Sequence, residues 1–256
     1  MTPVERRSEI VKIIRKQSRV TVEALAKSLH ISRETIRRDL TELANSGKVQ
    51  KFHGGASLPM MTGEGPFRAR MSDHVSAKVS IADQAVKLVS SGETLFIDTG
   101  STTLYFAEKL AEIPDITVVT NSAEIARILS LSSQRTKIFL LGGVFKGDNR
   151  QTVGSMAISQ IQSFRAHHAF LTVGAIDTRT GIMDFCIDEA QVAKAMIAQA
   201  GSLTVLADSS KFGRIASFEV CGLNQVSRLV CETPPTGVIK ESLSEAGVTV
   251  VSVPGS

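Results

Sequence analysis

Apolar side chains recur three or four residues apart in three short stretches at the start of the chain, which is the spacing of an amphipathic helix. The stripes are Ile10, Ile13 and Ile14, then Val22, Leu25 and Leu29, then Ile36, Leu40 and Leu43. Each stretch follows a residue that can cap a helix, namely Thr2, Thr21 or Ser32. The pattern predicts three helices, the third from 32 to about 46, and then a short hairpin over 48–55.

A different pattern runs from residue 78 onward, where helical stripes alternate with short apolar runs that predict strands. The predicted strands are 95–97, 116–119, 138–141, 169–173, 203–207 and 229–230, and the predicted helices cover 81–88, 104–110 and 189–200. Alternation of this kind is typical of a doubly wound α/β fold, in which helices cover both faces of a largely parallel sheet.

Residues 58–74 separate the two patterns. The segment contains two prolines and two glycines and has no apolar periodicity, so it predicts a linker. We therefore expect a small helical domain at 1–57, a linker at 58–74 and an α/β domain at 75–256. The length of 256 residues is sufficient for two domains of this size.

Charge distinguishes the two parts. The first 58 residues contain 12 basic and 6 acidic side chains, whereas the rest of the chain contains 17 basic and 19 acidic ones. A small basic domain joined to a nearly neutral one favours binding of nucleic acid by the first. A solvated basic face is the alternative that charge alone leaves open.

Several classes of protein are excluded by what the sequence lacks. The apolar runs are far shorter than the roughly 18 residues of a membrane span, so we expect a cytoplasmic protein that does not bind membranes. The three cysteines are odd in number and form no Cys-x-x-Cys pair, which predicts free buried thiols. Motifs for a nucleotide phosphate loop, a nucleophile elbow or a metal site are incomplete, so we expect no cofactor, no metal and no catalytic residue.

The third predicted helix has the chemistry of a helix that enters the major groove of DNA. Its apolar stripe turns arginines and hydroxyls outward near the N-terminus, where they can contact base edges and phosphates. The hairpin after it adds basic residues that can lie against the backbone. The DNA-binding candidates are Ser32, Arg33, Thr35, Arg37, Arg38, Lys51, His53 and Gly54. A small bundle that binds protein is the alternative reading.

Polar residues follow several predicted strands, and the carboxyl ends of parallel strands meet at the edge where ligands bind. Residues 98–103 combine a glycine turn, three hydroxyls and a helix N-terminus, which suits a phosphate; a plain capped turn is the alternative. The candidates for binding a small phosphorylated sugar are Asp98, Gly100, Ser101, Thr102, Thr103, Asn121, Gly143, Asp177 and Lys211.

Two sets of motifs resemble the DeoR family of bacterial transcriptional regulators. The segments 32–40 (SRETIRRDL) and 53–56 (HGGA) resemble its winged helix-turn-helix. The segments 98–103 (DTGSTT), 118–122 (VVTNS), 141–143 (LGG) and 207–213 (ADSSKFG) resemble its sugar-phosphate-sensing domain. The chain departs from the family at Lys51-Phe52, where an arginine usually precedes the wing histidine, and at Cys231–Thr233, where a Thr-Asp pair is common.

The resemblance implies a body akin to ribose-5-phosphate isomerase and a DNA-binding regulator of transcription. We expect a repressor of a carbohydrate catabolic operon that a phosphorylated sugar releases or modulates. Because paired half-sites of operator DNA need paired helices, we expect a homodimer or homotetramer. The main alternative is a sugar-phosphate isomerase, with Asp177 or Asp98 as base and Lys211 holding the substrate; a protein-binding adaptor is a third.

Overall fold

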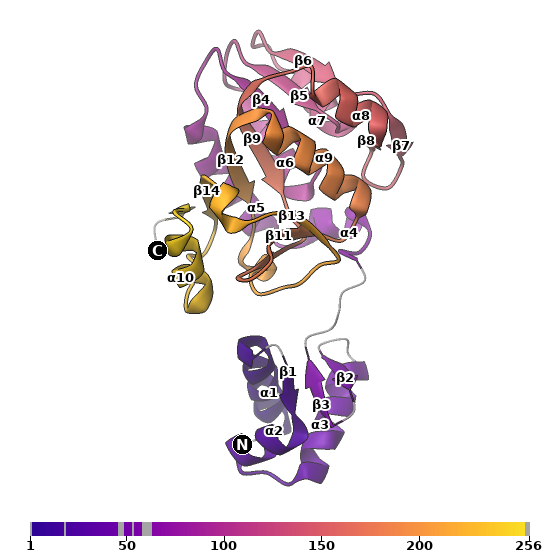
Figure 1. The fold of residues 1–256 in the computed structure, drawn as a ribbon, viewed down its shortest axis with the longest axis vertical. Coiled ribbons are helices and arrows are strands. Elements are labelled where there is room, and N and C mark those ends of the chain that lie inside the picture. Colours follow the sequence, from indigo (N-terminus) through magenta and orange to yellow (C-terminus); the bar gives the residue numbers. More distant parts are fainter. Residues whose placement is uncertain (1, 18, 46–48, 53, 58–62, 254–256) are drawn as a thin grey trace. The chain divides into compact units, whose positions relative to one another are not determined.

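The computed structural model describes residues 2–17, 19–45, 49–52, 54–57 and 63–253, and the chain divides into two units, Met1–Met61 and Thr62–Ser256. Each unit has its own hydrophobic core. Figure 1 labels the elements along the chain, and the two units are described separately below.

The described part of the N-terminal unit contains three helices and a three-stranded antiparallel sheet in the order β1-β3-β2. The elements are α1 (Pro3–Gln17), β1 (Arg19–Thr21), α2 (Val22–Leu29), α3 (Arg33–Asn45), β2 (Gln50–Phe52) and β3 (Gly55–Ser57). Ile10, Ile14, Leu25 and Ile36 are fully buried where the three helices meet. The three predicted helices and the hairpin are confirmed, and β1 is an additional strand that pairs with β3.

Side-chain caps begin the first two helices at the predicted residues. The Thr2 backbone N–H donates to the Glu5 carboxylate at 2.8 Å, and the Glu5 N–H donates to the Thr2 hydroxyl at 3.3 Å. This pair is a capping box. The Thr21 hydroxyl accepts from the Ala24 N–H at 3.2 Å. The predicted end of the third helix at 46–47 lies outside the described residues, as does His53 of the hairpin.

The second unit is built on a seven-stranded parallel sheet, in the order β15-β14-β12-β9-β4-β5-β6 among its described residues. The strands are β4 (Thr94–Ile97), β5 (Thr117–Thr120), β6 (Lys137–Leu140), β9 (Ala166–Thr172), β12 (Ala200–Leu206), β14 (Arg228–Cys231) and β15 (Thr249–Ser252). All six predicted strands are present, which confirms the largely parallel sheet.

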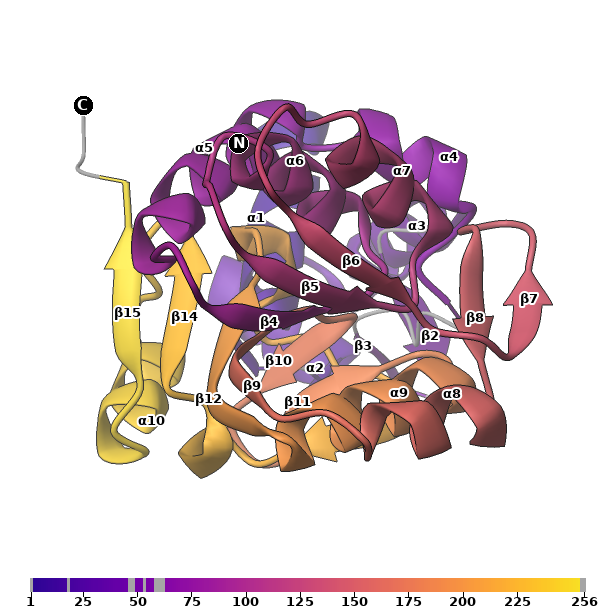
Figure 2. The same ribbon diagram turned by 90° about the horizontal axis from the view of Figure 1, so that it is seen from above.

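Helices cover both faces of this sheet, as Figure 2 shows. One face packs on α4 (Phe67–Ser72), α5 (Val75–Ala85), α6 (Ser101–Leu110) and α7 (Ala123–Ser130), and the other on α8 (Ser155–Ile161), α9 (Ile187–Ala198) and α10 (Val238–Glu245). The alternation of side chains in β4 creates both cores, because Leu95 and Ile97 join the first and Phe96 joins the second. The predicted doubly wound α/β fold is confirmed.

Two small antiparallel sheets follow strands of the parallel sheet. The hairpin of β7 (Val144–Lys146) and β8 (Gln151–Val153) comes after the carboxyl end of β6. The sheet of β10 (Ala175–Asp177), β11 (Gly181–Asp184) and β13 (Phe218–Cys221) begins after the carboxyl end of β9. Both insertions therefore bring polar residues to the edge of the sheet at which ligands of α/β proteins bind.

The predicted linker is too long at its C-terminal end. Helix α4 lies within 58–74, and residues from 62 onward belong to the second unit. Phe67 is buried in the core with Ile81 and Leu104, and its backbone N–H donates to the Asp148 carboxylate at 3.2 Å. Tertiary contacts thus stabilise a short helix in a segment whose prolines and glycines predict none.

No described helix is long and apolar enough to span a lipid bilayer.

Candidate functional site

The arginines of α3 lie on the surface of the N-terminal unit. The side chains of Arg33 and Arg37 are both 64% exposed, and Arg38 is exposed as well. Ile36 and Leu40 on the same helix are buried in the core. The helix is therefore fixed by one face and presents its basic face to solvent, which is the arrangement that a recognition helix needs.

Hydroxyl groups mark the N-terminus of this helix. The Ser32 hydroxyl accepts from the Thr35 N–H at 3.2 Å and lies 2.9 Å from the Thr35 hydroxyl. Ser32 is exposed and Thr35 is half-buried. The end of the helix that attracts phosphate thus combines free amides, hydroxyls and Arg33.

Two other arginines are not part of the exposed basic face, because they hold α1 against α3. Asp39 is buried, and its carboxylate accepts from Arg6 Nε at 2.5 Å and from Arg6 Nη2 at 3.1 Å. Arg7 pairs with Glu42. The basic excess of this unit is consequently divided between ion pairs that stabilise the fold and the arginines of the recognition helix.

The exposed arginines Arg33 and Arg37 form only weak ion pairs within the N-terminal unit. Arg33 Nη2 lies 2.8 Å from Glu23, and Arg37 Nη1 lies 3.7 Å from Glu34. All four side chains are more than half exposed, and such surface pairs contribute about 0–1 kcal/mol. DNA phosphates can replace these carboxylates at little cost.

The wing hairpin lies next to α3. Lys51 Nζ donates to the Thr41 hydroxyl at 2.9 Å, and the Arg19 guanidinium stacks 3.9 Å from the centre of the Phe52 ring. Gly54 has a φ of +87°, a conformation that side chains disfavour, so the turn needs glycine here. Lys51 is exposed, which leaves its charge near the recognition helix.

In the second unit, Asp98 ends β4 and faces the neighbouring strand. Its carboxylate accepts from the Thr172 N–H at 3.0 Å. Burial raises the pKa of Asp98 well above its ordinary value, the hydrogen bond from Thr172 opposes the rise, and the negative charges of Asp184, Glu189 and Glu64 add to it. Asp98 is therefore a buried carboxyl group that holds its proton unusually tightly.

The turn after Asp98 is closely packed. A Cβ on Gly100 would lie 1.9 Å from the Thr172 hydroxyl, so only glycine fits. The Thr103 hydroxyl is directed at the carbonyl oxygens of Asp98 and Gly100 at 2.9 and 3.0 Å. Ser101 and Thr102 are buried at the start of α6. Part of the predicted phosphate cradle thus serves to fasten the turn.

Asn121, at the end of β5, connects two strands with the β7–β8 hairpin. Its amide donates to Gln151 Oε1 at 3.3 Å and to the Thr152 carbonyl at 3.1 Å, while its oxygen accepts from the Thr99 hydroxyl at 3.3 Å. The side chain is buried, and all of these partners are polar.

A cavity opens at this edge of the sheet. Two of the effector-binding candidates predicted from the sequence, Asp98 and Asn121, line it. The remaining lining residues that carry polar side chains are Glu64, Arg70, Thr99, Gln151, Thr172, Asp184 and Glu189. Gly100, Ser101, Thr102 and Thr103 continue the chain behind Asp98 and Thr99 and do not line the cavity among the described residues.

Two predicted residues lie elsewhere. Gly143 is exposed in the connection between β6 and β7, where a φ of +144° favours glycine. The Asp177 carboxylate accepts from the backbone N–H groups of Arg179 and Thr180, both at 2.9 Å, and so closes the turn between β10 and β11. The structure does not bring either residue into the lining of the cavity.

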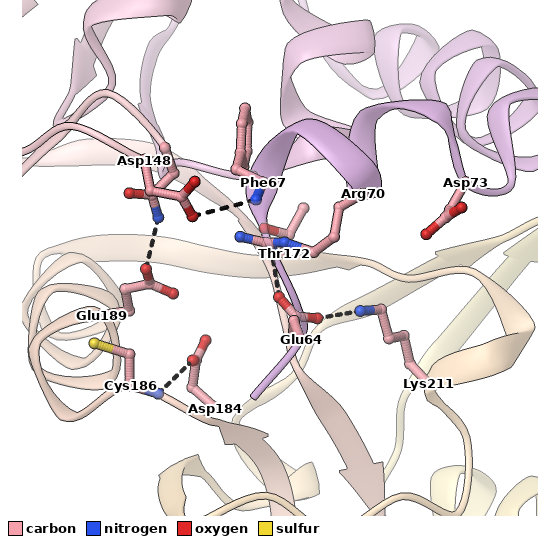
Figure 3. A network of polar contacts seen from close by, with 12 residues as sticks. Glu64, Phe67, Arg70, Asp73, Asp148, Thr172, Asp184, Cys186, Glu189 and Lys211 are labelled. Atoms are coloured by element: carbon pink, nitrogen blue, oxygen red, sulfur yellow. Dashed lines mark hydrogen bonds and ion pairs between the residues drawn. The ribbon is translucent and has the colours of Figure 1, made fainter. Parts of the chain in front are cut away.

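Lys211 is joined to the cavity through Glu64. It ends the short 3₁₀ helix Ser209–Lys211 that follows β12, and it pairs with one oxygen of the Glu64 carboxylate. The other oxygen pairs with Arg70 of α4. Figure 3 shows Glu64 between the two cationic side chains.

Acidic side chains form the other wall of the cavity. Burial, together with the charge of Glu189, raises the pKa of Asp184 to about 7. Glu189 accepts from Asn149 Nδ2 at 2.7 Å and from Gln151 Nε2 at 2.5 Å. The cavity therefore has Arg70 at one end, with Lys211 behind Glu64, and carboxyl and amide groups that can exchange hydrogen bonds along its wall.

Four charged residues that line the cavity were not among the candidates from the sequence. Glu64 and Arg70 lie in the segment predicted as a linker, whereas Asp184 precedes the predicted helix 189–200 and Glu189 begins it, without forming a motif. The sequence does contain a signal for Glu64 and Arg70, because these opposite charges lie on either side of Pro66-Phe67, where α4 begins.

The described residues contain no group of three or more His, Cys, Asp or Glu side chains arranged to hold a metal ion. Cys221 and Cys231 are buried free thiols, and burial raises the pKa of each to about 12. Cys186 is free and half-buried. The two buried thiols are therefore protonated and unreactive at neutral pH.

A basic winged helix joined to an α/β unit with a polar cavity at the edge of its sheet defines a class of DNA-binding proteins that respond to small molecules. The comparisons with known proteins agree with this class. Residues 6–62 match the DeoR-like helix-turn-helix domain, and residues 73–233 match the DeoR C-terminal sensor domain. The chain belongs to the DeoR family of transcriptional regulators.

Its relatives align over nearly their whole length. The transcriptional repressor CsqR of Escherichia coli strain K12 is 28% identical over 98% of this chain and 96% of its own. The transcriptional regulator GlpR of Haloferax volcanii is 31% identical over 98% of both chains. The glycerol-3-phosphate regulon repressor of Escherichia coli is 28% identical over 96% of this chain and 97% of its own.

Solved structures similar to the chain include ribose 5-phosphate isomerase A of Methanocaldococcus jannaschii. It is 20% identical and covers 53% of both chains with a TM-score of 0.38.

Proposed function

We propose that the protein is a repressor of a carbohydrate catabolic operon that binds double-stranded operator DNA and is released or modulated by a phosphorylated sugar. Membership of the DeoR family supports regulation of transcription. The names of its relatives, which include a glycerol-3-phosphate regulon repressor, support repression and a phosphorylated effector.

The cavity is the observation that carries the effector part of the proposal. Arg70 and Lys211 supply two cations within reach of one anionic group. Asp98, Asp184 and Asn121 supply groups that exchange hydrogen bonds with hydroxyls. The charges and hydrogen-bonding groups at the cavity match the chemistry of a small molecule with a phosphate at one end and hydroxyl groups along its length.

The DNA part of the proposal rests on α3 and the wing. Arg33, Arg37 and Arg38 are available for base edges and phosphates, and Lys51 lies beside them on the wing. A single recognition helix reads only one half-site, so the active form is at least a dimer on a symmetric operator. Sedimentation of the protein on operator DNA measures this state.

Binding without catalysis agrees best with the residues at the cavity. Of the two candidate bases of an isomerase, Asp177 closes a turn away from the cavity, whereas Asp98 lines the cavity, is buried and accepts from the Thr172 N–H. The relatives are named as transcriptional regulators. A general base must reach the proton that it removes, and Asp177 does not line the cavity.

Calorimetric titration of the full chain with phosphorylated three-carbon to six-carbon sugars tests the proposal. One of these compounds should bind, whereas its dephosphorylated form should not, because the cations would lose their partner. The same compound should not be turned over. Turnover of a sugar phosphate would support the alternative that the protein is an isomerase. If no member of the panel bound, the proposal of a phosphorylated sugar effector would be wrong.

A further inference from the structure

The carboxylate of Glu64 lies between two cationic side chains at one end of the cavity. Its two carboxylate oxygens pair with different cations, one with Arg70 and one with Lys211. The side chains of the three residues are only 12%, 18% and 18% exposed. Figure 3 shows the carboxylate between Arg70 and Lys211, beside Asp184. A carboxylate in this position has the geometry of an anionic ligand.

The backbone that carries Arg70 is held by contacts that do not depend on Glu64. The Asp148 carboxylate accepts from the Phe67 N–H at the start of α4. The buried Lys78 donates to the carbonyl oxygens of Arg70 and Asp73 at the other end of this helix. The position of the Arg70 backbone is therefore fixed without Glu64.

Lys211 is fixed in a comparable way on the opposite side. The Asp208 carboxylate caps its 3₁₀ helix by accepting from the Ser210 N–H at 2.9 Å. Burial raises the pKa of Asp208, but the hydrogen bond from Ser210 and the charge of Lys211 outweigh it and lower the pKa overall. A stably ionised Asp208 thus lies near the cation.

The pairing with Glu64 leaves one donor of Arg70 unused. The Nε atom of Arg70 is buried and has no hydrogen-bond partner among the described residues. A buried donor without a partner is unfavourable. A phosphate group has three terminal oxygens and a charge of about −1.5 to −2 at neutral pH, so it can satisfy Arg70 at two nitrogens and Lys211 at once.

Glu64 also adds to a concentration of negative charge. Its charge contributes to the elevated pKa values of Asp98 and Asp184 on the cavity wall. The Glu64 carboxylate therefore neutralises two cations and at the same time acts on the two wall acids, as any anion bound between Arg70 and Lys211 would.

We propose that the Glu64 carboxylate is an internal competitor of the effector: it occupies the place between Arg70 and Lys211 that the phosphate of the effector takes when it displaces Glu64. This inference rests on the proposed function, because it assumes a phosphorylated effector in this cavity. It assigns the phosphate to side chains of α4 and of the turn after β12, because residues 100–103 of the glycine turn before α6 do not line the cavity.

The position of Glu64 in the sequence connects this exchange with DNA binding. Glu64 belongs to the stretch between β3 of the N-terminal unit and α4 of the second unit. While Glu64 is paired, residues 63–66 are held beside α4 in the second unit. When phosphate displaces Glu64, the ion pairs with Arg70 and Lys211 are lost. Binding of the effector therefore frees the segment that leads to the DNA-binding unit from these two contacts.

The test compares the full chain with its Glu64→Gln variant, with inorganic phosphate as the probe in a phosphate-free buffer. Glutamine keeps the size of the side chain and removes the competing charge. The variant should bind phosphate about tenfold or more tightly, because the site no longer has to be vacated. Its thermal stability should fall without phosphate and recover when phosphate is added, since two cations lose their partner.

A matched control is Glu124→Gln. Glu124 also bridges two arginines, at 2.7 Å from Arg127 and 2.8 Å from Arg150, but it does not line the cavity. The control removes the same charge and should leave phosphate affinity within twofold of the parent. Glu64→Ala provides a second variant, and Arg70→Ala in the Glu64→Gln background should abolish the gain.

The outcomes separate the inference from the proposed function. If the parent chain binds a phosphorylated sugar but Glu64→Gln and Glu64→Ala bind phosphate no more tightly, Glu64 has a structural role and the inference is wrong. If neither the parent nor these variants binds phosphate or any phosphorylated sugar, the proposed effector itself is wrong. If Glu124→Gln increased the affinity for phosphate equally, the loss of one negative charge anywhere in the chain would explain the effect, and the inference would again be wrong.

Discussion

The carboxyl groups at the cavity differ in their surroundings and therefore in their roles. Burial is the largest cause of the elevated pKa of both Asp98 and Asp184, and the charge of Asp184 adds to the rise at Asp98. Glu64 has a different role, because Arg70 and Lys211 pair with it directly. A cavity wall with acids that hold protons suits hydroxyl groups, which donate to and accept from such groups.

The pKa of Asp184 predicts a pH-dependent stability. Its folded-state pKa of about 7 lies above the ordinary value of 3.8, so the folded chain retains a proton that the unfolded chain loses as pH rises between these values. Stability therefore falls through this window. Asp184→Asn should match the parent near pH 4 and exceed it by on the order of 2–4 kcal/mol at pH 8.

Thermal unfolding of the two proteins from pH 4 to pH 8 measures this difference. Asparagine can still accept the hydrogen bond that Asp184 receives from the Cys186 N–H at 3.0 Å, so local geometry is kept. Asp188→Asn is a suitable control, because Asp188 pairs with Lys146 at the surface. A stabilisation by Asp184→Asn that does not change with pH would contradict the account.

Among the elements, α3 and the wing illustrate how one fold separates stability from recognition. The buried face of α3, together with the pair formed by Arg6 and Asp39, fixes the helix in its unit. Its other face retains Arg38, and Lys51 of β2 projects beside it to Thr41. Substitutions on the second face should therefore alter DNA binding and leave folding intact.

Two single variants separate contacts with bases from contacts with phosphates. Arg38→Ala should weaken specific binding by about 1–3 kcal/mol and reduce the preference for the operator over unrelated DNA. Lys51→Ala should weaken binding to both DNAs alike and lower the slope of log affinity against log salt by about 1. Fluorescence anisotropy at several salt concentrations measures both quantities.

The two effects must differ for the assignment to stand. If Arg38→Ala weakened both DNAs equally, Arg38 would be a phosphate contact. If Lys51→Ala left the salt slope unchanged, the wing would not touch the backbone.

For the molecule as a whole, the sequence predicted the fold more completely than the site. Helix caps at Thr2 and Thr21 and the apolar runs of the parallel strands depend on neighbours within a few residues, so local patterns reveal them. The short strands β1, β7 and β10 have no such signal. They form because partner strands elsewhere in the fold supply their hydrogen bonds.

The site was predictable where it follows the parallel strands and hidden where it depends on tertiary contacts. Asp98 and Asn121 could be found because they end strands at the ligand-binding edge. Glu64 and Lys211 are 147 residues apart, and no spacing rule joins them. The proline and glycine residues near Glu64 favoured a linker, whereas the burial of Phe67 stabilises a helix there.

The central claim is that one chain joins operator binding to recognition of a phosphorylated sugar. Its most direct test is an anisotropy titration of the full protein against the DNA upstream of its own gene, with and without each phosphorylated sugar and its dephosphorylated form. The account predicts tight, salt-sensitive binding that one phosphorylated compound changes and its dephosphorylated form does not. Tight binding that no phosphorylated sugar alters, or no preference for this DNA over unrelated DNA, would contradict it.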